Sequence, residues 1–298
     1  MKTLVIITGP TAVGKTDLSI ELALRWKTDI ISCDSRQIYR EMKIGTAVPD
    51  EQQLKRVKHH FIGSVSIHQY YSAFRYEQDA LKILHNLFSE KDIAVMTGGS
   101  GLYMDAILNG LDEMPDADPA IREELKKKLS EQGLTPLLQQ LEILDPAYFQ
   151  RVDQKNPARI IRGLEVCLST GKTFTEFRKK KEVTRDFQIL LIGLELPRST
   201  LYEKIERRVD AMMDAGLLEE AKALLPYRSL PALNTVGYRE CFGFLDGQFD
   251  LTEAIRLIKR NTRHYARRQI TWNNRYPDIR FYNPSEPEEI VAYCESKF

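Results

Sequence analysis

The residues that decide the fold are Leu-Val-Ile-Ile-Thr-Gly-Pro-Thr-Ala-Val-Gly-Lys-Thr, positions 4–16. The run 4–7 is continuously apolar and rich in β-branched residues, which is typical of a strand buried on both faces. Residues 9–16 then match Gly-x-x-x-x-Gly-Lys-[Ser/Thr] in full, and Leu18 and Leu22 follow at helical spacing. Strand, glycine loop and helix in this order predict a phosphate-binding loop.

The chemistry of such a loop explains its residue types. Glycines let the backbone wrap closely around an anion, so that successive N–H groups and the helix N-terminus point at it. Lys15 adds a positive charge, and the hydroxyl of Thr16 suits a Mg²⁺ ion. We therefore expect a bound di- or triphosphate. The residues expected to hold it are Gly9, Thr11, Ala12, Val13, Gly14, Lys15 and Thr16.

Further strand signals follow along the chain, at 29–33, 93–97, 187–194 and 279–282. Helical patterns separate them, including a long one over 251–273, and this alternation predicts an α/β fold: a P-loop kinase-like parallel sheet flanked by helices. Residues 113–186 instead show helical patterning with almost no strand signal. We therefore expect an α/β core with C-terminal helices, formed by residues 1–112 and 187–298, and a mostly helical insertion at 113–186.

One aspartate stands at the end of a predicted strand. A P-loop ATPase carries a magnesium-binding Asp after an apolar strand, but the strand at 93–97 runs into Gly98-Gly99-Ser100-Gly101. The acid at a strand end is Asp34, and because parallel strands share one carboxyl edge, we expect it beside the bound phosphates. There it would serve as a metal ligand or a general base; helix capping or turn formation is the alternative. Ser100 would offer a hydroxyl beside the reacting groups, unless 98–101 is a plain glycine turn.

Composition excludes several classes of protein. The 298 residues are 43% hydrophobic and carry 43 basic against 42 acidic side chains, a net charge of +1, which excludes an extreme polyanion-binding tail and a disordered acidic chain. The four cysteines lie far apart and are expected to be free thiols in a reducing compartment. No apolar run is long enough for a signal-peptide core or a membrane span. We expect a cytoplasmic protein with no membrane partner.

Two stretches are locally basic despite the near-neutral total. Residues 151–185 hold ten Lys or Arg against four Asp or Glu, and residues 256–280 hold eight against one. In the second stretch the cations recur at three- and four-residue spacing, as a stripe along one helix. A solvated charged face explains one such stripe, whereas two of them beside a phosphate site favour contact with an RNA backbone.

Two other features have plainer explanations. His59-His60 suggests a metal, but no third ligand is suitably spaced, so a loop or packing role is favoured. The tyrosines at 70, 71 and 76 with Phe74 would line a substrate channel or stack on a base, or form half-buried core packing.

The motifs together resemble the bacterial tRNA dimethylallyltransferases. The resemblance rests on seven ordered segments that span most of the chain. They are the phosphate loop at 9–16, Asp-Ser-Arg-Gln-Ile-Tyr-Arg at 34–40 with Ile-Gly-Thr-Ala at 44–47, His-His-Phe-Ile at 59–62, Gly-Gly-Ser-Gly-Leu-Tyr at 98–103, Arg-Ile-Ile-Arg-Gly-Leu-Glu-Val at 159–166, Gly-Tyr-Arg-Glu at 237–240, and Thr-Arg-His-Tyr-Ala-Arg-Arg-Gln-Ile-Thr-Trp at 262–272.

The resemblance implies a reaction and a set of site residues. Dimethylallyl diphosphate would donate its dimethylallyl group to the exocyclic N6 of the adenosine 3′ of the anticodon (position 37), in tRNAs that read codons beginning with U, giving N6-isopentenyladenosine. Asp34 and Ser100 would be catalytic, Arg208 would bind the diphosphate, and Mg²⁺ would be the cofactor. The protein would act as a monomer on the tRNA anticodon stem-loop. The residues expected to contact this RNA are Asp34, Ser35, Arg36, Gln37, Ser100, Arg122, Arg159, Ile160, Ile161 and Arg162.

Three positions depart from the family pattern, and two rival functions remain. The family usually has Met, Asp and Thr where this sequence has Arg36, Gly63 and Ser100; Ser keeps the hydroxyl of Thr, whereas the other two affect the shape of the tRNA contact. The rivals are a P-loop kinase acting on a small hydroxyl or nucleoside, with Asp34 as its base, and an ATP-gated RNA-binding protein. The strand without an acid at its end disfavours both, and the basic insertion disfavours the kinase.

Overall fold

The structure is a computed structural model that describes residues 1–116, 118–179 and 183–298. It divides into two compact units, the core at 1–108 with 184–298 and the insertion at 109–183. These boundaries lie within four residues of the expected ones.

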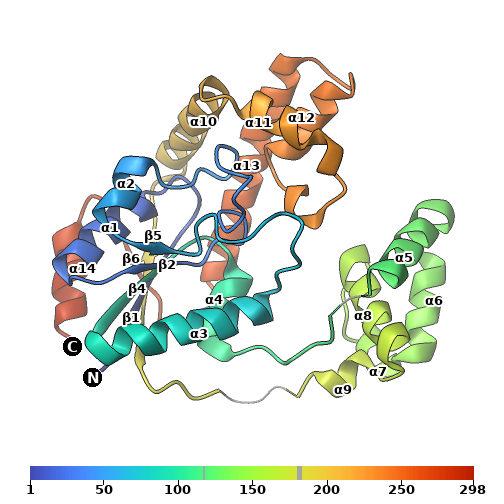
Figure 1. The fold of residues 1–298 in the computed structure, drawn as a ribbon, viewed down its shortest axis with the longest axis horizontal. Helices are drawn as coiled ribbons and strands as arrows, with labels where there is room; N and C mark the ends of the chain where they lie inside the picture. Colours follow the sequence, from blue (N-terminus) through green and yellow to red (C-terminus); the bar gives the residue numbers. More distant parts are fainter. Residues whose placement is uncertain (117, 180–182) are drawn as a thin grey trace. The chain divides into compact units, whose positions relative to one another are not determined.

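The core is built on a six-stranded sheet with the order β3-β2-β4-β1-β5-β6 (Figure 1). Every paired neighbour runs parallel. The strands are β1 (Thr3–Thr8), β2 (Ile30–Ser32), β3 (His59–His60), β4 (Ile93–Thr97), β5 (Gln188–Leu194) and β6 (Arg280–Tyr282). The predicted parallel α/β fold is confirmed. The strand that the sequence did not predict is β3, because a strand of two residues is too short to give a periodic signal.

Alternate side chains of β1 supply the cores on the two faces of the sheet, and all six residues of this strand are buried. Leu4 and Ile6 pack with one set of helices, and Val5 and Ile7 with another. Those on the first face are α3 (Ala73–Glu90), α4 (Gly101–Asn109), α11 (Leu217–Leu224) and α12 (Tyr238–Leu245). Those on the second are α1 (Lys15–Arg25), α10 (Arg198–Asp214) and α14 (Pro287–Glu295).

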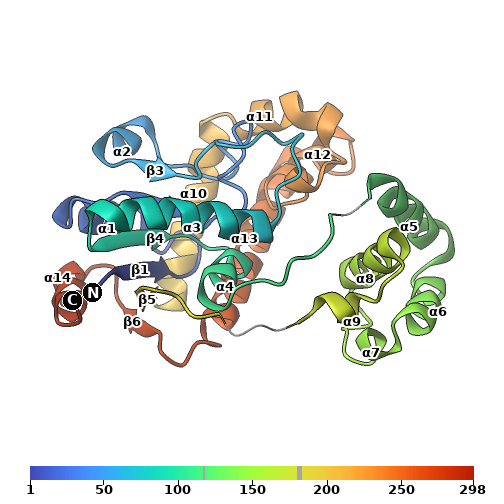
Figure 2. The ribbon, with the colours of Figure 1, turned by 60° about the horizontal axis from the view of Figure 1, so that its bottom comes forward.

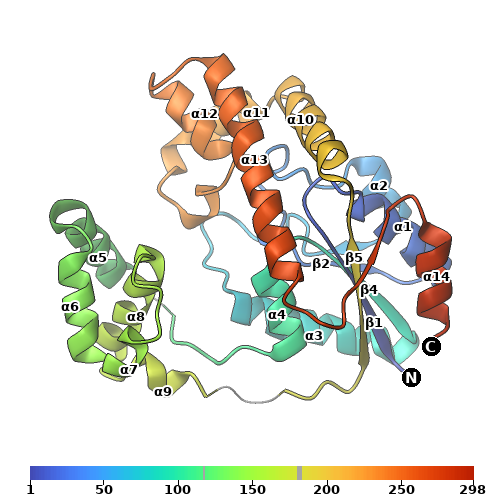
Figure 3. The same cartoon turned by 180° about the vertical axis from the view of Figure 1, so that it is seen from behind.

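Helix α13 (Leu251–Asn273) coincides with the predicted helix at 251–273. It is long, packs against both α10 and α12, and is seen from behind the sheet in Figure 3. The core also contains α2 (Glu51–Arg56) and two short 3₁₀ helices, η1 (Leu225–Tyr227) and η2 (Pro231–Leu233). Among the described residues, none of the helices is both long and apolar enough to cross a membrane.

The insertion is a cluster of five helices with its own apolar core (Figure 2). They are α5 (Pro119–Gln132), α6 (Thr135–Leu144), α7 (Pro146–Phe149), α8 (Pro157–Thr170) and α9 (Phe174–Phe177). Asn156 caps the start of α8, because its side chain accepts a hydrogen bond from the Arg159 N–H and Pro157 occupies the first turn.

Candidate active site

The carboxyl edge of the sheet opens into a cavity of about 850 Å³. The phosphate loop, the segment after β2 and the turn after β4 line it at the strand ends, as expected for a parallel sheet. Helices α10 and α13 contribute further walls. Residues that are far apart in sequence therefore meet at one site within the core.

The phosphate loop has the backbone that its glycines predict. Gly9 has φ +146°, and a Cβ there would lie 2.7 Å from the Leu194 carbonyl oxygen. Gly14 has φ +116° and precedes α1 as its N-cap residue. The Lys15 ammonium donates to the carbonyl oxygens of Gly9 and Pro10, each at 2.9 Å. The lysine thus lies folded against its own loop, over the position where an anion would bind.

Two cations lie close enough to share this site. Burial, and after it the positive charge of Arg208, lower the pKa of Lys15 to about 8, although the Asp34 carboxylate opposes both effects. Burial also lowers the pKa of Arg208, again opposed by Asp34. An anion bound between these cations would remove their mutual repulsion, so the site is prepared for a phosphate group.

Asp34 both lines the cavity and forms a turn. Its Oδ1 accepts hydrogen bonds from the N–H groups of Arg36 at 2.8 Å and Gln37 at 3.2 Å. Within the described part of the chain, its Oδ2 accepts none. The turn and the functional interpretation are therefore compatible, because one oxygen fixes the backbone and the other remains able to take a proton.

Ser100 supports this turn from the adjacent strand end. Its Oγ accepts from the Ser35 N–H at 2.8 Å and donates to the Ser35 Oγ at 2.9 Å. Ser100 itself is absent from the described cavity lining, which includes its neighbours Gly98 and Gly99. In this structure, its hydroxyl holds the segment that carries Asp34.

The cavity lining includes most of the predicted diphosphate and RNA residues of the core. They are Thr11, Ala12, Gly14, Lys15, Thr16, Asp34, Ser35, Arg36, Gln37 and Arg208. Gly9 and Val13 are exceptions: Gly9 receives the lysine through its carbonyl, and the Val13 side chain is buried in the apolar core. The Val13 N–H donates to the Pro10 carbonyl oxygen at 3.3 Å.

Several other residues that line the cavity were not predicted from the sequence as site residues. Lys204, Arg207, Arg239 and Arg268 add four cations to the same cavity. Arg268 lies over the ring of Tyr265, with 5.8 Å between the guanidinium carbon and the ring centroid. Helical spacing points to Lys204, which lies four residues before Arg208 on α10, whereas Arg207 has no such signal.

A loop at residues 45–49 forms another part of the wall and is held by one carboxylate. Glu220 accepts hydrogen bonds from the N–H groups of Lys43, Ile44 and Gly45 at 2.9–3.0 Å. It also accepts from the Tyr238 hydroxyl at 2.6 Å. A Cβ on Gly45 would lie 2.6 Å from the Tyr238 ring, which explains glycine at this position.

A family sequence model described as IPP transferase matches residues 37–276. The chain belongs to this family. A tRNA dimethylallyltransferase of Bacteroides thetaiotaomicron is 50% identical over 293 residues, which are 98% of this chain and 95% of that protein.

Two solved structures are similar to this IPP transferase over most of their length. The tRNA isopentenylpyrophosphate transferase of Bacillus halodurans gives a TM-score of 0.73 at 32% identity, covering 100% of this chain and 97% of that one. A eukaryotic dimethylallyltransferase acting on tRNA gives 0.78 at 25% identity, covering 95% and 74%.

The insertion of this IPP transferase separates the predicted RNA residues into two kinds. Glu165 is fully buried, and Arg122 and Arg162 both pair with it, at 2.9 Å and 3.4 Å. Arg162 also donates to the Pro115 carbonyl at 2.7 Å. Arg159 is exposed, without a side-chain partner among the described residues.

The side chains of Ile160 and Ile161 are buried in the apolar core of the insertion, at 0% and 9% exposure. An RNA contact through these two side chains is therefore inconsistent with the structure. Lys180 and Lys181, which belong to the basic stretch at 151–185, lie outside the described residues.

The basic stripe along α13 is partly used inside the core. Lys259 pairs with Asp210 and Arg263 with Glu206, both at 2.6 Å and both across to α10. Arg256 pairs with Glu253 on its own helix, also at 2.6 Å. The three- and four-residue spacing of these cations therefore reflects ion pairs that hold the helix as well as any contact with RNA. Among the cations of α13, Arg268 lines the cavity.

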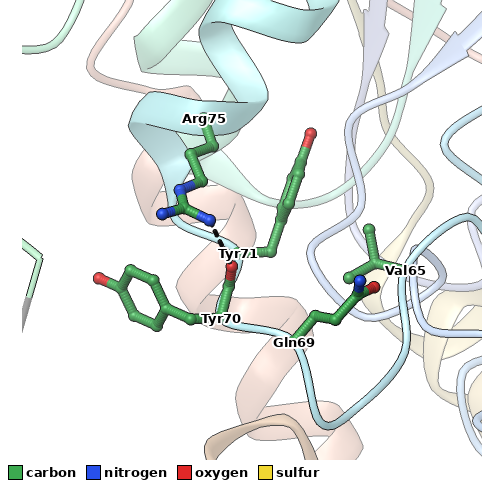
Figure 4. Close-up of a pocket in the computed structure, with 5 residues that line it drawn as sticks. All are labelled: Val65, Gln69, Tyr70, Tyr71 and Arg75. Carbon is green, nitrogen blue, oxygen red and sulfur yellow. Dashed lines mark hydrogen bonds between the residues drawn. The ribbon is translucent and has the colours of Figure 1, made fainter. Parts of the chain in front are cut away.

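The tyrosine cluster also divides between two environments. Tyr76 is fully buried and its ring stacks on Tyr103, with 4.2 Å between centroids. Tyr70 and Tyr71 line a second cavity of about 370 Å³ with Val65, Gln69 and Arg75 (Figure 4). The Arg75 guanidinium donates to the Tyr70 carbonyl at 3.2 Å and lies 5.6 Å from the Tyr70 ring centroid.

The two histidines have structural partners. His60 Nε2 lies 2.9 Å from Asp29 Oδ2, and His59 Nδ1 lies 2.8 Å from the Val57 carbonyl oxygen. No group of three or more His, Cys, Asp or Glu side chains among the described residues is arranged to hold a metal. The described residues therefore contain no metal site built from three or more such side chains.

Proposed function

We propose that this IPP transferase is a tRNA dimethylallyltransferase that moves a dimethylallyl group from dimethylallyl diphosphate to N6 of adenosine 37, next to the anticodon. The observation that carries the proposal is the common cavity of the phosphate loop and Asp34. The loop supplies a site for the diphosphate leaving group. Asp34 supplies an acceptor for the proton of the attacking amine.

The exocyclic nitrogen of adenine attacks the first carbon of the prenyl group, and a C–N bond forms as the C–O bond to the diphosphate breaks. The electron pair of the C–O bond leaves with the diphosphate, and the N6 proton passes to Asp34. Because the amine lone pair is delocalised into the purine ring, removing that proton accelerates attack, typically by about 10²–10⁴-fold.

Charge that develops on the leaving diphosphate is met by Lys15, Arg208 and the loop N–H groups. Lys15 and Arg208 already line one cavity before the reaction, which favours electrostatic stabilisation of the transition state. Thr16 would hold Mg²⁺ through its hydroxyl, and Asp34 lines the same cavity. When bound, that ion would supply further neutralisation of the leaving group.

The substrate adenosine has to leave its stack to reach the cavity. Enzymes that modify a base take it out of the stack and read it in a pocket. A volume of about 850 Å³ supports this, because the cavity must admit a purine beside a prenyl diphosphate. Arg36, Arg239 and Arg268 supply positive charge beyond that around the phosphate loop, which suits the backbone of an anticodon stem-loop.

The remaining predictions concern the compartment, the oligomeric state and the substrate tRNAs of the enzyme. All four cysteines are buried free thiols, which supports the cytoplasm as its compartment. One chain supplies the phosphate loop, Asp34 and Arg208, which supports a monomer as the active form. The uridine-first codon class of the substrate tRNAs stays a prediction from the family resemblance.

One experiment separates this function from its rivals. The protein is incubated with Mg²⁺, ATP, dimethylallyl diphosphate and an unmodified tRNA with three consecutive adenosines at positions 36–38, and the digested nucleosides are weighed. We expect a mass gain on adenosine that corresponds to isopentenyladenosine. Phosphate release from ATP without a mass gain on adenosine would instead support a kinase or an ATP-gated RNA-binding protein.

A further inference from the structure

Helix α13 presents buried polar side chains to the phosphate loop and to the turn after β4. Tyr265, Gln269 and Asn273 lie four residues apart, so they share one face of the helix. Gln269 is 7% exposed and Asn273 is 3% exposed. Asn273 Oδ1 accepts from the Thr8 hydroxyl at 3.1 Å, and the Tyr265 hydroxyl donates to the Gly99 carbonyl at 3.4 Å.

Gln269 joins two strand ends through one amide. Its Oε1 accepts from the Thr11 N–H at 2.8 Å, inside the phosphate loop. Its Nε2 donates to the Gly99 carbonyl at 2.9 Å, in the turn after β4. The fit is close, because a Cβ on Gly99 would lie 2.1 Å from that Nε2.

The Gly99 turn leads directly to Asp34. Ser100 follows Gly99, and its hydroxyl accepts from the Ser35 N–H at 2.8 Å. Ser35 in turn follows Asp34, whose Oδ1 closes the turn on Arg36. A continuous set of hydrogen bonds and short backbone segments therefore runs from Thr11 in the leaving-group site to the proposed base.

We propose that Gln269 is a positioning residue that fixes the distance between the phosphate loop and the Asp34 turn. It reacts with neither substrate. Because the Thr11 N–H already donates to Gln269 Oε1, this amide is not among those that the loop offers to the diphosphate. The inference rests on the proposed function, since it concerns the spacing of the two halves of that reaction.

The test uses Gln269→Met, which keeps the length of the side chain and removes both hydrogen bonds. A shift of the base by about 1 Å can cost up to about 10²-fold in rate. We expect kcat to fall by about 10–100-fold while the KM for tRNA stays within about twofold of wild type. Thr271→Ala is the matched control, because this exposed hydroxyl on α13 bonds only to the Arg267 carbonyl among the described residues.

A double-mutant cycle distinguishes positioning from simple stabilisation. Ser100→Ala breaks a later link of the same connection, so adding it to Gln269→Met should reduce kcat by no more than about threefold further. Gly99→Ala displaces the Gln269 amide from the opposite side and provides a second variant should Gln269→Met fold poorly; we expect the same loss of kcat.

Two outcomes would overturn the inference while leaving the proposed function intact. Both assume that the wild type is active. The first is that Gln269→Met and Gly99→Ala each keep kcat within about twofold of wild type. The second is that the fold-losses in kcat of Gln269→Met and Ser100→Ala multiply in the double variant. An inactive wild type would instead refute the proposed function itself.

Discussion

At the scale of single residues, the site depends on placing opposite charges around one anion. Lys15 and Arg208 repel each other across the cavity, and the Asp34 carboxylate partly offsets this. A site that holds cations together in this way is stabilised by a ligand that carries negative charge. The same balance gives Lys15 a proton that it can lose near neutral pH.

The lowered pKa of Lys15 predicts a pH dependence of diphosphate use. A lysine with a pKa of about 8 is mostly charged below that pH and loses its charge as the pH rises through it. At saturating tRNA, we expect kcat/KM for dimethylallyl diphosphate to fall toward tenfold per pH unit above about pH 8.

Lys15→Arg tests this assignment, because a guanidinium stays protonated throughout that range. Its activity is expected to be lower than that of wild type, with no matching decline between about pH 8 and about pH 9.5. An equally steep decline in the variant would assign the titration to another group.

At the scale of structural elements, carboxylates hold the segments that form the cavity wall. Glu220 on α11 fixes the loop before Thr46 through three backbone N–H groups and the Tyr238 hydroxyl. Burial and the charge of Glu220 hold the pKa of Tyr238 well above its ordinary value, so the hydroxyl remains a donor. The wall therefore depends on a residue that does not itself line the cavity.

Glu220→Gln should weaken this loop, because the amide offers one acceptor oxygen where the carboxylate offers two. Hydrogen bonds to a charged group contribute about 1.5–3 kcal/mol each, so we expect the free energy of unfolding to fall by about 2–3 kcal/mol. The KM for both substrates should rise. Glu219→Gln, at an exposed neighbour on the same helix, is the control, and equal losses in the two variants would contradict the role of Glu220.

In the insertion, the structure predicts different effects for two arginines on α8. Arg159→Ala should weaken tRNA binding severalfold, reduce the slope of log affinity against log salt by about 1, and leave stability within about 0.5 kcal/mol. Arg162→Ala removes a partner of the buried Glu165 and should cost about 1–3 kcal/mol of stability.

Binding titrations at several salt concentrations, together with thermal denaturation, measure both effects. A normal salt slope in Arg159→Ala would remove this residue from the RNA contact. Unchanged stability in Arg162→Ala would show that Arg122 alone satisfies Glu165.

At the scale of the whole molecule, the sequence predicted what local chemistry constrains. The phosphate loop was identifiable because its glycines, lysine and threonine must be adjacent, and Asp34 because a parallel sheet brings strand ends to one edge. The Gln269–Gly99 contact joins residues 170 positions apart, so no local pattern predicts it. The Glu165 pairs with Arg122 and Arg162 were equally hidden, since a basic motif does not reveal which cations are paired.

The most direct test of the account measures one turnover with Asp34→Asn. Asparagine keeps the Oδ1 acceptor that closes the turn on Arg36 and Gln37, but it cannot take the amine proton. In a preformed complex with tRNA and dimethylallyl diphosphate, we expect prenyl transfer to slow by about 10²–10⁴-fold, with both dissociation constants within about twofold of wild type. A transfer rate equal to that of wild type, or a loss confined to tRNA affinity, would contradict the assignment of Asp34 as the base.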